Sequence, residues 1–407
     1  MTRATDPAPD LLLTGARVVD PRNGVDAVAD VEIRDARIAA VGKDLPRRPG
    51  VPVRALDGML VVPGLIDLHT HVYHKATSYG VDPDAIALRS VLATMVDAGS
   101  AGAGTYAGFR DFVMRGARTR LLAWLNVSFP GIFAFERGVM VGEAANEALL
   151  SVEHCRAVAQ QNPDTVVGIK VRLGAAVSGD VGLRALDRAL AVAEPLGLPV
   201  MTHIGAPQPG YAEILARMRA GDVLTHCFRP APNAPVDADG KILPALREAR
   251  ARGVLFDVGH GMGAFSFAST QAALDDGFAP DIVSSDVHAL TVNGPGWDLL
   301  HVMSKLLNCG IDLVDLVRMT TDAPARAIGR ADASAGREPL GALGVGAPAD
   351  LAVLRVADVP LAFVDVAGAR RDGVRLLRAV GLVRAGRWHD PTPRPWEESS
   401  PNPPGPR

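Results

Sequence analysis

From Leu65 onward the chain alternates between two kinds of stretch, and this alternation restricts the fold more than any other feature. Apolar runs of strand length are followed by longer stretches that are rich in Ala, Leu and Arg and have helical periodicity. Eight such runs end near His71, Asp97–Gly99, Asn126–Ser128, Lys170, His203, His226, His260 and Asp286. A strand with its return helix takes about 30 residues, which matches the spacing of these ends. The sequence therefore predicts an α/β fold with a (β/α)8 TIM-like barrel over residues 63–335.

The two ends of the chain have another pattern, with short alternating strands and frequent turns. Residues 1–62 carry turn signals at Thr14-Gly15 and near Asn23-Gly24, between strand-like runs. A β pattern returns after Gly341. We expect residues 1–62 and 336–390 to form one small β-sandwich domain built from both termini. Residues 391–407 are rich in Pro, Glu and Ser, and we expect a disordered tail there.

Composition narrows the classes of function. Hydrophobic residues make up 48% and aromatic residues 5% of the chain, which is typical of a parallel sheet buried on both faces. The net charge of −3 comes without a basic block, so there is no electrostatic case for nucleic acid. No apolar run reaches the ~20 residues of a membrane span, Met1–Asp10 lacks the apolar core of a signal peptide, and the three cysteines are too scattered for a disulfide framework. We expect a cytoplasmic protein with a small-molecule substrate and without nucleic-acid or membrane partners.

Polar residues stand at the ends of several predicted barrel strands. The run Val61–His71 ends with His69-Thr70-His71, and residues i and i+2 of a strand point to the same face, so both histidines can reach one metal ion. Taken alone, each residue has an ordinary alternative: a packed histidine, an aspartate that caps a helix, or a lysine whose amine reaches solvent. Barrel enzymes build their sites at the carboxyl ends of the strands. The coincidence of six such residues on one barrel predicts a metal site made by His69, His71, Lys170, His203, His226 and Asp286.

The order of these residues resembles the amidohydrolase superfamily of metal-dependent hydrolases. The resemblance rests on the HxH motif after Pro63-Gly64-Leu65-Ile66-Asp67 and on the later lysine, histidines and aspartate, and it extends over nearly the whole chain. It implies two divalent metal ions, with zinc as the expected metal. It also implies that Lys170 is carboxylated by CO2, because a carboxylated lysine offers anionic oxygens where an ammonium offers no lone pair. The first metal would be held by His69, His71 and Asp286, the second by His203 and His226, and Lys170 would bridge them.

Shorter segments resemble the amidohydrolase/deacetylase branch, which stands near the dihydroorotases. They are Gly168–Arg172, Asp257–Gly261 and Tyr73–Asp82. This resemblance implies a deacetylase or deacylase that cleaves the amide or ester bond of a small N-acyl or O-acyl acid.

The ligand set implies a mechanism in which a metal-bridging hydroxide attacks the acyl carbonyl. Asp286 would take the proton of the water and pass it to the leaving group. His260 has no place among the ligands, so we expect it to contact the substrate or the developing oxyanion, or else to support the site from behind. Arg172 would hold a substrate carboxylate in its fork, with a solvated loop arginine as the alternative. Tyr73 is a further candidate donor to the substrate.

Three alternatives stay open. A cyclic amidase of the dihydroorotase or dihydropyrimidinase type uses a similar ligand set, although dihydroorotases carry an arginine two residues after the HxH motif, where this chain has Tyr73. A mononuclear deaminase would not need Lys170. A structural homologue without activity would lack ligands, and none is missing here.

One interval between barrel strands is too long for a simple connection. It contains the apolar segment Phe129–Phe135 and a helix with His154. A long apolar segment after a barrel strand lies at the catalytic face, so residues 129–150 are either a lid or a subunit contact. We expect a homo-oligomer.

Overall fold

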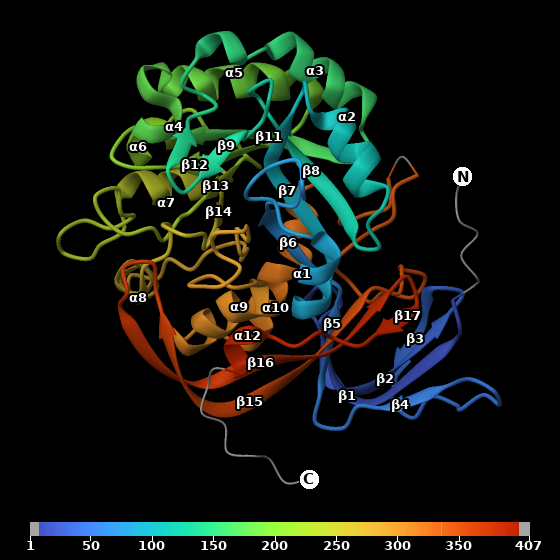
Figure 1. Ribbon diagram of the computed structural model, residues 1–407. Helices are drawn as coiled ribbons and strands as arrows, with labels where there is room; N and C mark the ends of the chain where they lie inside the picture. The colour runs from blue at the N-terminus through green and yellow to red at the C-terminus, as the bar shows by residue number, and fades with distance from the viewer. Residues whose placement is uncertain (1–7, 335, 399–407) are drawn as a thin grey trace.

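A computed structural model describes residues 8–334 and 336–398. A parallel sheet surrounded by helices forms the larger part, and strands from the two ends of the chain form the smaller part (Figure 1). The parallel sheet has the order β14-β13-β12-β11-β8-β7-β6. These strands are β6 (Leu65–Thr70), β7 (Leu92–Gly102), β8 (Arg120–Asn126), β11 (Val166–Leu173), β12 (Val200–Ile204), β13 (Val223–Thr225) and β14 (Leu255–Asp257).

An eighth, irregular strand closes the barrel between β14 and β6. Single parallel bridges join Asp257 to Ile282 and Thr70 to Val287. The amide of Asp286 donates to His69 O at 2.8 Å, and the amide of His71 donates to Val287 O at 3.0 Å. The eight-stranded barrel predicted from the sequence is confirmed.

Helices follow the strands and cover the outside of the barrel. They are α1 (Pro83–Ser90), α2 (Tyr106–Gly108), α3 (Val152–Gln161), α4 (Ala175–Ser178), α5 (Leu183–Ala193), α6 (Tyr211–Leu215), α7 (Pro244–Ala251), α8 (Phe267–Asp275), α9 (Leu299–Asn308), α10 (Leu313–Thr320) and α11 (Asp322–Ala327), with a π-helix, η2 (Phe109–Met114), and 3-10 turns η3 (Glu147–Leu149), η4 (Gly179–Val181) and η5 (Glu194–Leu196). One further 3-10 turn, η1 (Pro21–Asn23), belongs to the N-terminal part of the chain. None of these helices is both long and apolar enough to cross a lipid bilayer.

Strand alternation decides which side chains enter the barrel. In β11 the apolar side chains of Ile169 and Val171 belong to the large core between strands and helices. Lys170 and Arg172 alternate with them, so both point inward from the carboxyl end of the strand. A mainly aliphatic cluster with Trp124 fills the barrel interior.

The strands from the two chain ends form one mixed sheet with the order β17-β16-β15-β5-β1-β2-β3, and β4 pairs with β1. They are β1 (Leu11–Asp20), β2 (Val25–Arg34), β3 (Arg37–Gly42), β4 (Val53–Ala55), β5 (Leu60–Pro63), β15 (Leu351–Val364), β16 (Arg370–Arg384) and β17 (Arg387–His389). β15 lies antiparallel to β5 and joins the two ends of the chain. The sheet has an apolar core of its own, and both ends of the chain contribute strands to it, whereas the sandwich domain with its predicted bounds stays a prediction.

Gly64 separates the terminal sheet from the barrel. Its amide donates to Asp350 O at 2.8 Å, and a Cβ atom at this position would lie 2.6 Å from the Cβ of Ala93. A larger residue would therefore push β5 and β7 apart at the point where the two parts of the molecule meet.

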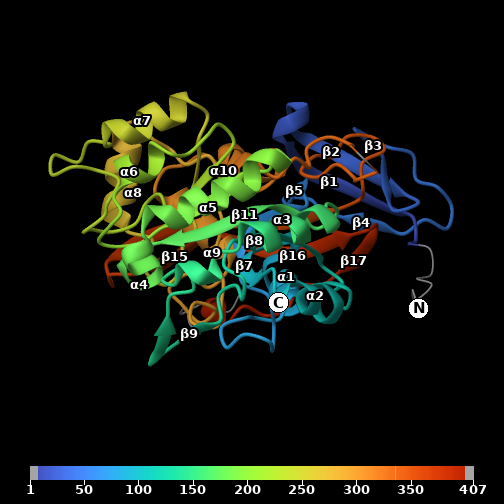
Figure 2. The same cartoon turned by 90° about the horizontal axis from the view of Figure 1, so that it is seen from above.

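The long interval after β8 contains a hairpin, β9 (Ala134–Glu136) and β10 (Val139–Val141). The hairpin projects from the body of the protein (Figure 2). Val139, Met140 and Val141 are each more than half exposed, whereas Phe135 faces inward and lines a cavity at the barrel mouth.

The described part of the expected disordered tail is folded against the barrel. Arg394 Nη2 lies 2.9 Å from Asp298 Oδ1, and both side chains are buried. Trp396, in α12 (Pro395–Glu398), is 4% exposed and lies against His301. The expectation of disorder is thus not met over residues 391–398, because two side chains find buried partners, and residues 399–407 lie outside the described part.

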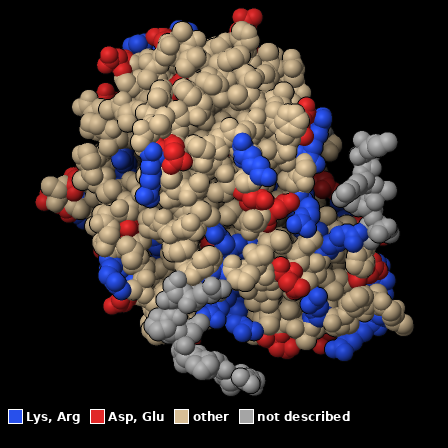
Figure 3. Space-filling view, viewed as in Figure 1, with Lys and Arg blue, Asp and Glu red and all other residues tan. Residues whose placement is uncertain are grey.

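Charged side chains of both signs are interspersed over the face seen in Figure 3. Most of those visible lie over the lower half of this view, where the terminal sheet is found.

Candidate active site

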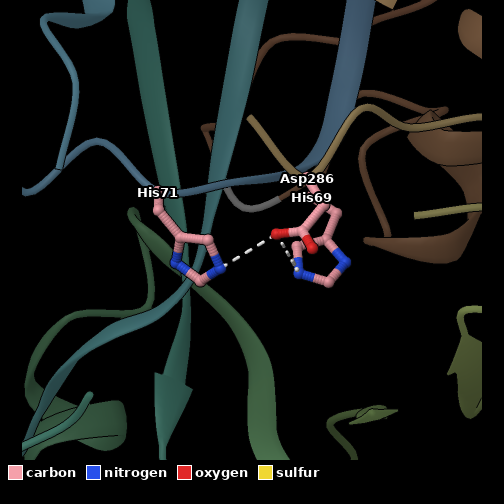
Figure 4. A group of neighbouring side chains, drawn as sticks. All are labelled: His69, His71 and Asp286. Carbon is pink, nitrogen blue, oxygen red and sulfur yellow. Dashed lines mark ion pairs between the residues drawn. The ribbon is translucent and has the colours of Figure 1, made fainter. Parts of the chain in front are cut away.

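Three side chains meet where β6 ends beside the closing strand of the barrel (Figure 4). Asp286 Oδ1 lies 3.1 Å from His71 Nε2 and 3.3 Å from His69 Nε2. All three residues are buried, and one potential ligand atom from each lies within 4.8 Å of the others. This is the first of the two predicted ligand groups.

The donor atoms of this group fit a bound cation. Asp286 Oδ1 is buried and has no hydrogen-bond partner among the described residues. Burial lowers the pKa of His71 to about 3 and that of His69 well below its usual value, so both imidazoles are neutral and can offer a lone pair. A buried carboxylate oxygen that faces two neutral imidazole nitrogens is costly unless a cation neutralises it.

Hydrogen bonds behind two of the histidines set their tautomers. Thr225 Oγ1 donates to Asp257 Oδ2 at 2.7 Å, so it accepts from His69 Nδ1 at 2.9 Å. His226 Nδ1 lies 2.6 Å from Gly259 O, which can only accept. Both rings therefore carry their proton on Nδ1, which leaves the lone pair of Nε2 free to bind a metal.

Lys170, His203 and His226 lie beside the first three residues. Lys170 Nζ is 3.4 Å from His69 Nε2, the ring centroids of His203 and His226 are 4.4 Å apart, and those of His69 and His226 are 5.2 Å apart. The structure thus brings all six sequence-predicted ligand residues into one cluster. Burial lowers the pKa of Lys170 to about 7, so a large part of this amine is uncharged at neutral pH.

Two of these residues have strained backbones. His226 has φ 74° and Asp286 has φ 50°, in the left-handed region that few residues other than glycine occupy. Such conformations cost about 1–3 kcal/mol and cluster at functional sites. Both residues lie outside the named strands, and both line the cavity at the barrel mouth.

A cavity of about 230 Å³ opens onto this cluster. Five of the six residues line it, and Lys170 lies fully buried beneath. The apolar part of its wall includes Tyr79, Ile132, Phe135 and Met262, and the polar part includes Arg172, Arg229 and His288.

Arg172 lines the cavity but is already paired. Its Nε and Nη2 atoms donate to the two carboxylate oxygens of Glu143 at 2.7 and 2.6 Å, and Glu143 is fully buried. Its guanidinium also lies 5.2 Å from the centre of the Phe135 ring. Arg172 therefore ties the segment 129–150 to the barrel.

Tyr73 and His260 are not brought to the cavity. Tyr73 donates to Thr105 O at 3.1 Å and packs on Phe109. His260 Nδ1 donates to Gly261 O at 2.9 Å, and its Nε2 lies 2.8 Å from Lys305 Nζ. Both ring nitrogens of His260 are occupied, so the structure does not support the expected contact of either residue with a substrate.

Sequence reasoning missed two polar residues of the cavity wall. His288 stands two residues after Asp286, and its Nδ1 accepts from the amide of Leu290 at 3.2 Å, so its Nε2 carries a proton. Arg229 stands three residues after His226 on a loop. Their closeness in sequence to two predicted ligands was a signal that could have identified them.

Comparison with known proteins gives a consistent result. The sequence profile of the amidohydrolase family matches residues 60–371. A deacetylase of Enterococcus faecalis is 32% identical over 94% of this chain and 99% of its own length. Crystal structures of an adenine deaminase and of a dihydroorotase are 30% and 31% identical, with TM-scores of 0.85 and 0.84, and the alignments cover 94% of this chain and 100% and 98% of theirs. By its sequence and its fold, this chain belongs to the amidohydrolase family.

Proposed function

We propose that the protein is a binuclear metal-dependent deacylase that cleaves the amide or ester bond of a small N-acyl or O-acyl acid. The observation that carries this proposal is the cluster of six predicted ligand residues at one small cavity, in which Asp286 Oδ1 has no hydrogen-bond partner among the described residues. The similarity to deacetylases over most of the chain supports the type of reaction.

His69, His71 and Asp286 would hold one ion, His203 and His226 would hold the other, and Lys170 would bridge them after reaction with CO2. Zinc suits this set of imidazole and carboxylate donors. When bound, the two ions supply an activated water and polarise the acyl carbonyl.

The protein's own side chains transfer the proton, orient the substrate and exclude water. Asp286 takes the proton of the attacking water and gives it to the leaving nitrogen or oxygen, since its carboxylate contacts both histidines and lines the cavity. His288 directs its Nε2 proton from the wall of the cavity and orients the substrate. Phe135 and Ile132 shield the reacting groups from water.

A second candidate function is a cyclic amidase, which the similarity to a dihydroorotase favours. The residue two positions after the HxH motif weighs against it. Tyr73 offers no positive charge, and its hydroxyl is turned to Thr105 O rather than into the cavity. A dihydroorotase of the usual kind would need a carboxylate-binding residue there.

The test is metal analysis followed by a substrate panel. We expect two ions per chain after expression with zinc and bicarbonate. The panel contains N-acetyl amino acids, O-acetyl hydroxy acids, lactones, dihydroorotate and adenine. Turnover of the acyl acids above all others supports the proposal. One ion or none per chain, or preferred turnover of dihydroorotate or adenine, contradicts it.

A further inference from the structure

We propose that Arg229 binds the carboxylate of the substrate and thereby restricts the enzyme to 2-acylamino and 2-acyloxy acids. This inference rests on the proposed deacylase function and names its substrate class. It assigns to Arg229 the role that the sequence suggested for Arg172.

The first observation is that Arg229 is a buried cation with no carboxylate partner among the described residues. Its residue is 8% exposed and lines the cavity. No carboxylate of the described residues pairs with it, and its Nε is buried without a hydrogen-bond partner. Burial consequently lowers its pKa from the usual value. A guanidinium in such a place is costly until an anion binds it.

Three other buried arginines show what is missing. Arg89 and Arg394 share the carboxylate of Asp298, and Arg172 is held by Glu143 through two hydrogen bonds. In each of these places the chain supplies its own counter-charge. At Arg229 the described residues supply a neutral acceptor instead, the carbonyl oxygen of Ile204, which accepts from Nη1 at 3.2 Å.

The second observation is the position of Arg229 within the cavity. It stands on the loop after β13, three residues after His226, and its bond to Ile204 O places Nη1 beside the residue that follows His203. Ser269 Oγ donates to Arg229 O at 2.9 Å and holds the backbone. The guanidinium is therefore fixed next to the two histidines of the second ligand group.

These positions limit the distance between the two ends of the substrate. The acyl carbonyl must lie over the ligand cluster while the carboxylate reaches Arg229, and both must fit in about 230 Å³. Such a volume lies below the usual range for ligand pockets. An acid whose acylated nitrogen or oxygen is on the carbon next to the carboxylate meets this limit.

The test uses pairs of substrates that differ only in charge. These are N-acetylalanine and O-acetyllactate, each as both enantiomers, and their carboxamides. The variants are Arg229→Gln and Arg229→Lys. Arg217→Gln is the control, because Arg217 is an exposed arginine that pairs with Asp187. Metal content and thermal unfolding of every variant are measured alongside kcat and KM.

We expect Arg229→Gln to lower kcat/KM for the acids at least about 30-fold, the factor that corresponds to losing one buried charged partner. The carboxamides should change less than about 3-fold, and Arg229→Lys should keep part of the selectivity because it keeps the charge. Added guanidinium ion should partly restore Arg229→Gln. Equal losses for acids and carboxamides, or no loss, would overturn the inference.

Binding of the deacylated products separates this inference from the proposed function. If the metal-loaded wild type cleaves none of the acids, the deacylase proposal fails, and calorimetry with alanine and lactate still tests Arg229. Binding of these acids that is weakened in Arg229→Gln supports the anion site, whereas equal binding by both proteins rejects it. If the wild type cleaves the acids and Arg229→Gln does so equally well, only the role of Arg229 is wrong.

Discussion

The guanidinium of Arg172 and the carboxylate of Glu143 face each other with both pairs of atoms in contact, and neither charge reaches solvent freely. One partner comes from β11 and the other from the segment after the β9–β10 hairpin. This pair holds a wall of the cavity in place, so its removal should act on stability before it acts on substrate choice.

The first prediction concerns Arg172→Met. The variant leaves Glu143 as a buried charge without a partner, and breaking such a pair costs about 3–5 kcal/mol. We expect a lower urea midpoint and equal relative losses of kcat/KM for acids and their carboxamides. The double variant Arg172→Met with Glu143→Leu should recover much of the stability. A single variant as stable as wild type would contradict this account.

Asp286→Asn tests the proton transfer. Asparagine keeps the shape and one oxygen donor, but it accepts no proton at neutral pH. We expect the variant to retain much of its metal and to lose at least about 10²-fold in kcat, within the usual contribution of general acid–base catalysis. Metal content and kcat are measured on the same preparation. A metal-replete variant with normal kcat would assign the proton transfer to another group.

Lys170→Ala tests the bridge. Lys170 is fully buried and lies 3.4 Å from His69 Nε2, so the variant opens a gap in the middle of the cluster. We expect loss of both ions and of activity. Bicarbonate should help to reconstitute metal-free wild type but not the variant, and short carboxylic acids should partly rescue the variant. Two ions and full turnover in Lys170→Ala would refute the bridging role.

Thr225→Val tests the hydrogen bond that sets the tautomer of His69. The methyl group cannot accept from Nδ1, and loss of such a partner typically weakens metal binding about 10–100-fold. Competition with a chelator measures this change. Thr202→Val is the matched control on the next strand, since Thr202 Oγ1 is buried without a hydrogen-bond partner in the described structure. Similar effects of the two variants would show that the hydroxyl of Thr225 has no special role.

The last prediction concerns acid stability of the metal-free protein. Burial lowers the pKa of His226 to about 3 in the folded state, whereas a histidine in an unfolded chain titrates near about 6.5. Between these values the unfolded chain binds the additional proton, so this residue makes the free energy of unfolding fall as the pH falls from 6.5 toward 3.

His226→Asn removes that contribution and suits the left-handed backbone at φ 74°. Urea unfolding with chelator between pH 4.5 and 6.5 should give a slope that is shallower by up to about 1.4 kcal/mol per pH unit, which corresponds to one proton. The same slope in wild type and variant would mean that His226 is already protonated when folded.

The gathering of the six predicted ligand residues could be foreseen because it follows from one geometric rule. In a parallel barrel all strands end at the same face, so His69 and Asp286, more than two hundred residues apart, must meet there. Because alternate side chains of a strand share a face, it could also be predicted that Arg172 points inward, as Lys170 does. The terminal β strands could also be predicted, because apolar and polar residues alternate along them and glycines mark the turns between them.

Partners that come from distant parts of the chain could not be predicted. The sequence around Arg172 does not indicate that its guanidinium will bind Glu143. The sequence around His260 does not indicate that Lys305 will contact its Nε2. The fold of residues 391–398 depends in the same way on Asp298, a buried acid that accepts from Arg394. Local pattern gives the face on which a side chain lies, and long-range pairing then decides whether it is free to act.

The antiparallel pairing of β5 with β15 has a consequence for how the protein is made. Val61 lies opposite Val353, and the apolar core of the terminal sheet needs Leu351, Val353 and Val383 to complete it. A ribosome synthesises β1–β5 first. Almost three hundred further residues are synthesised before β15, the strand that pairs with β5, leaves the ribosome. The whole barrel is translated within that interval, so β1–β5 are synthesised first but complete their sheet late. A chain that is truncated before Leu351 leaves the edge of β5 without a pairing strand.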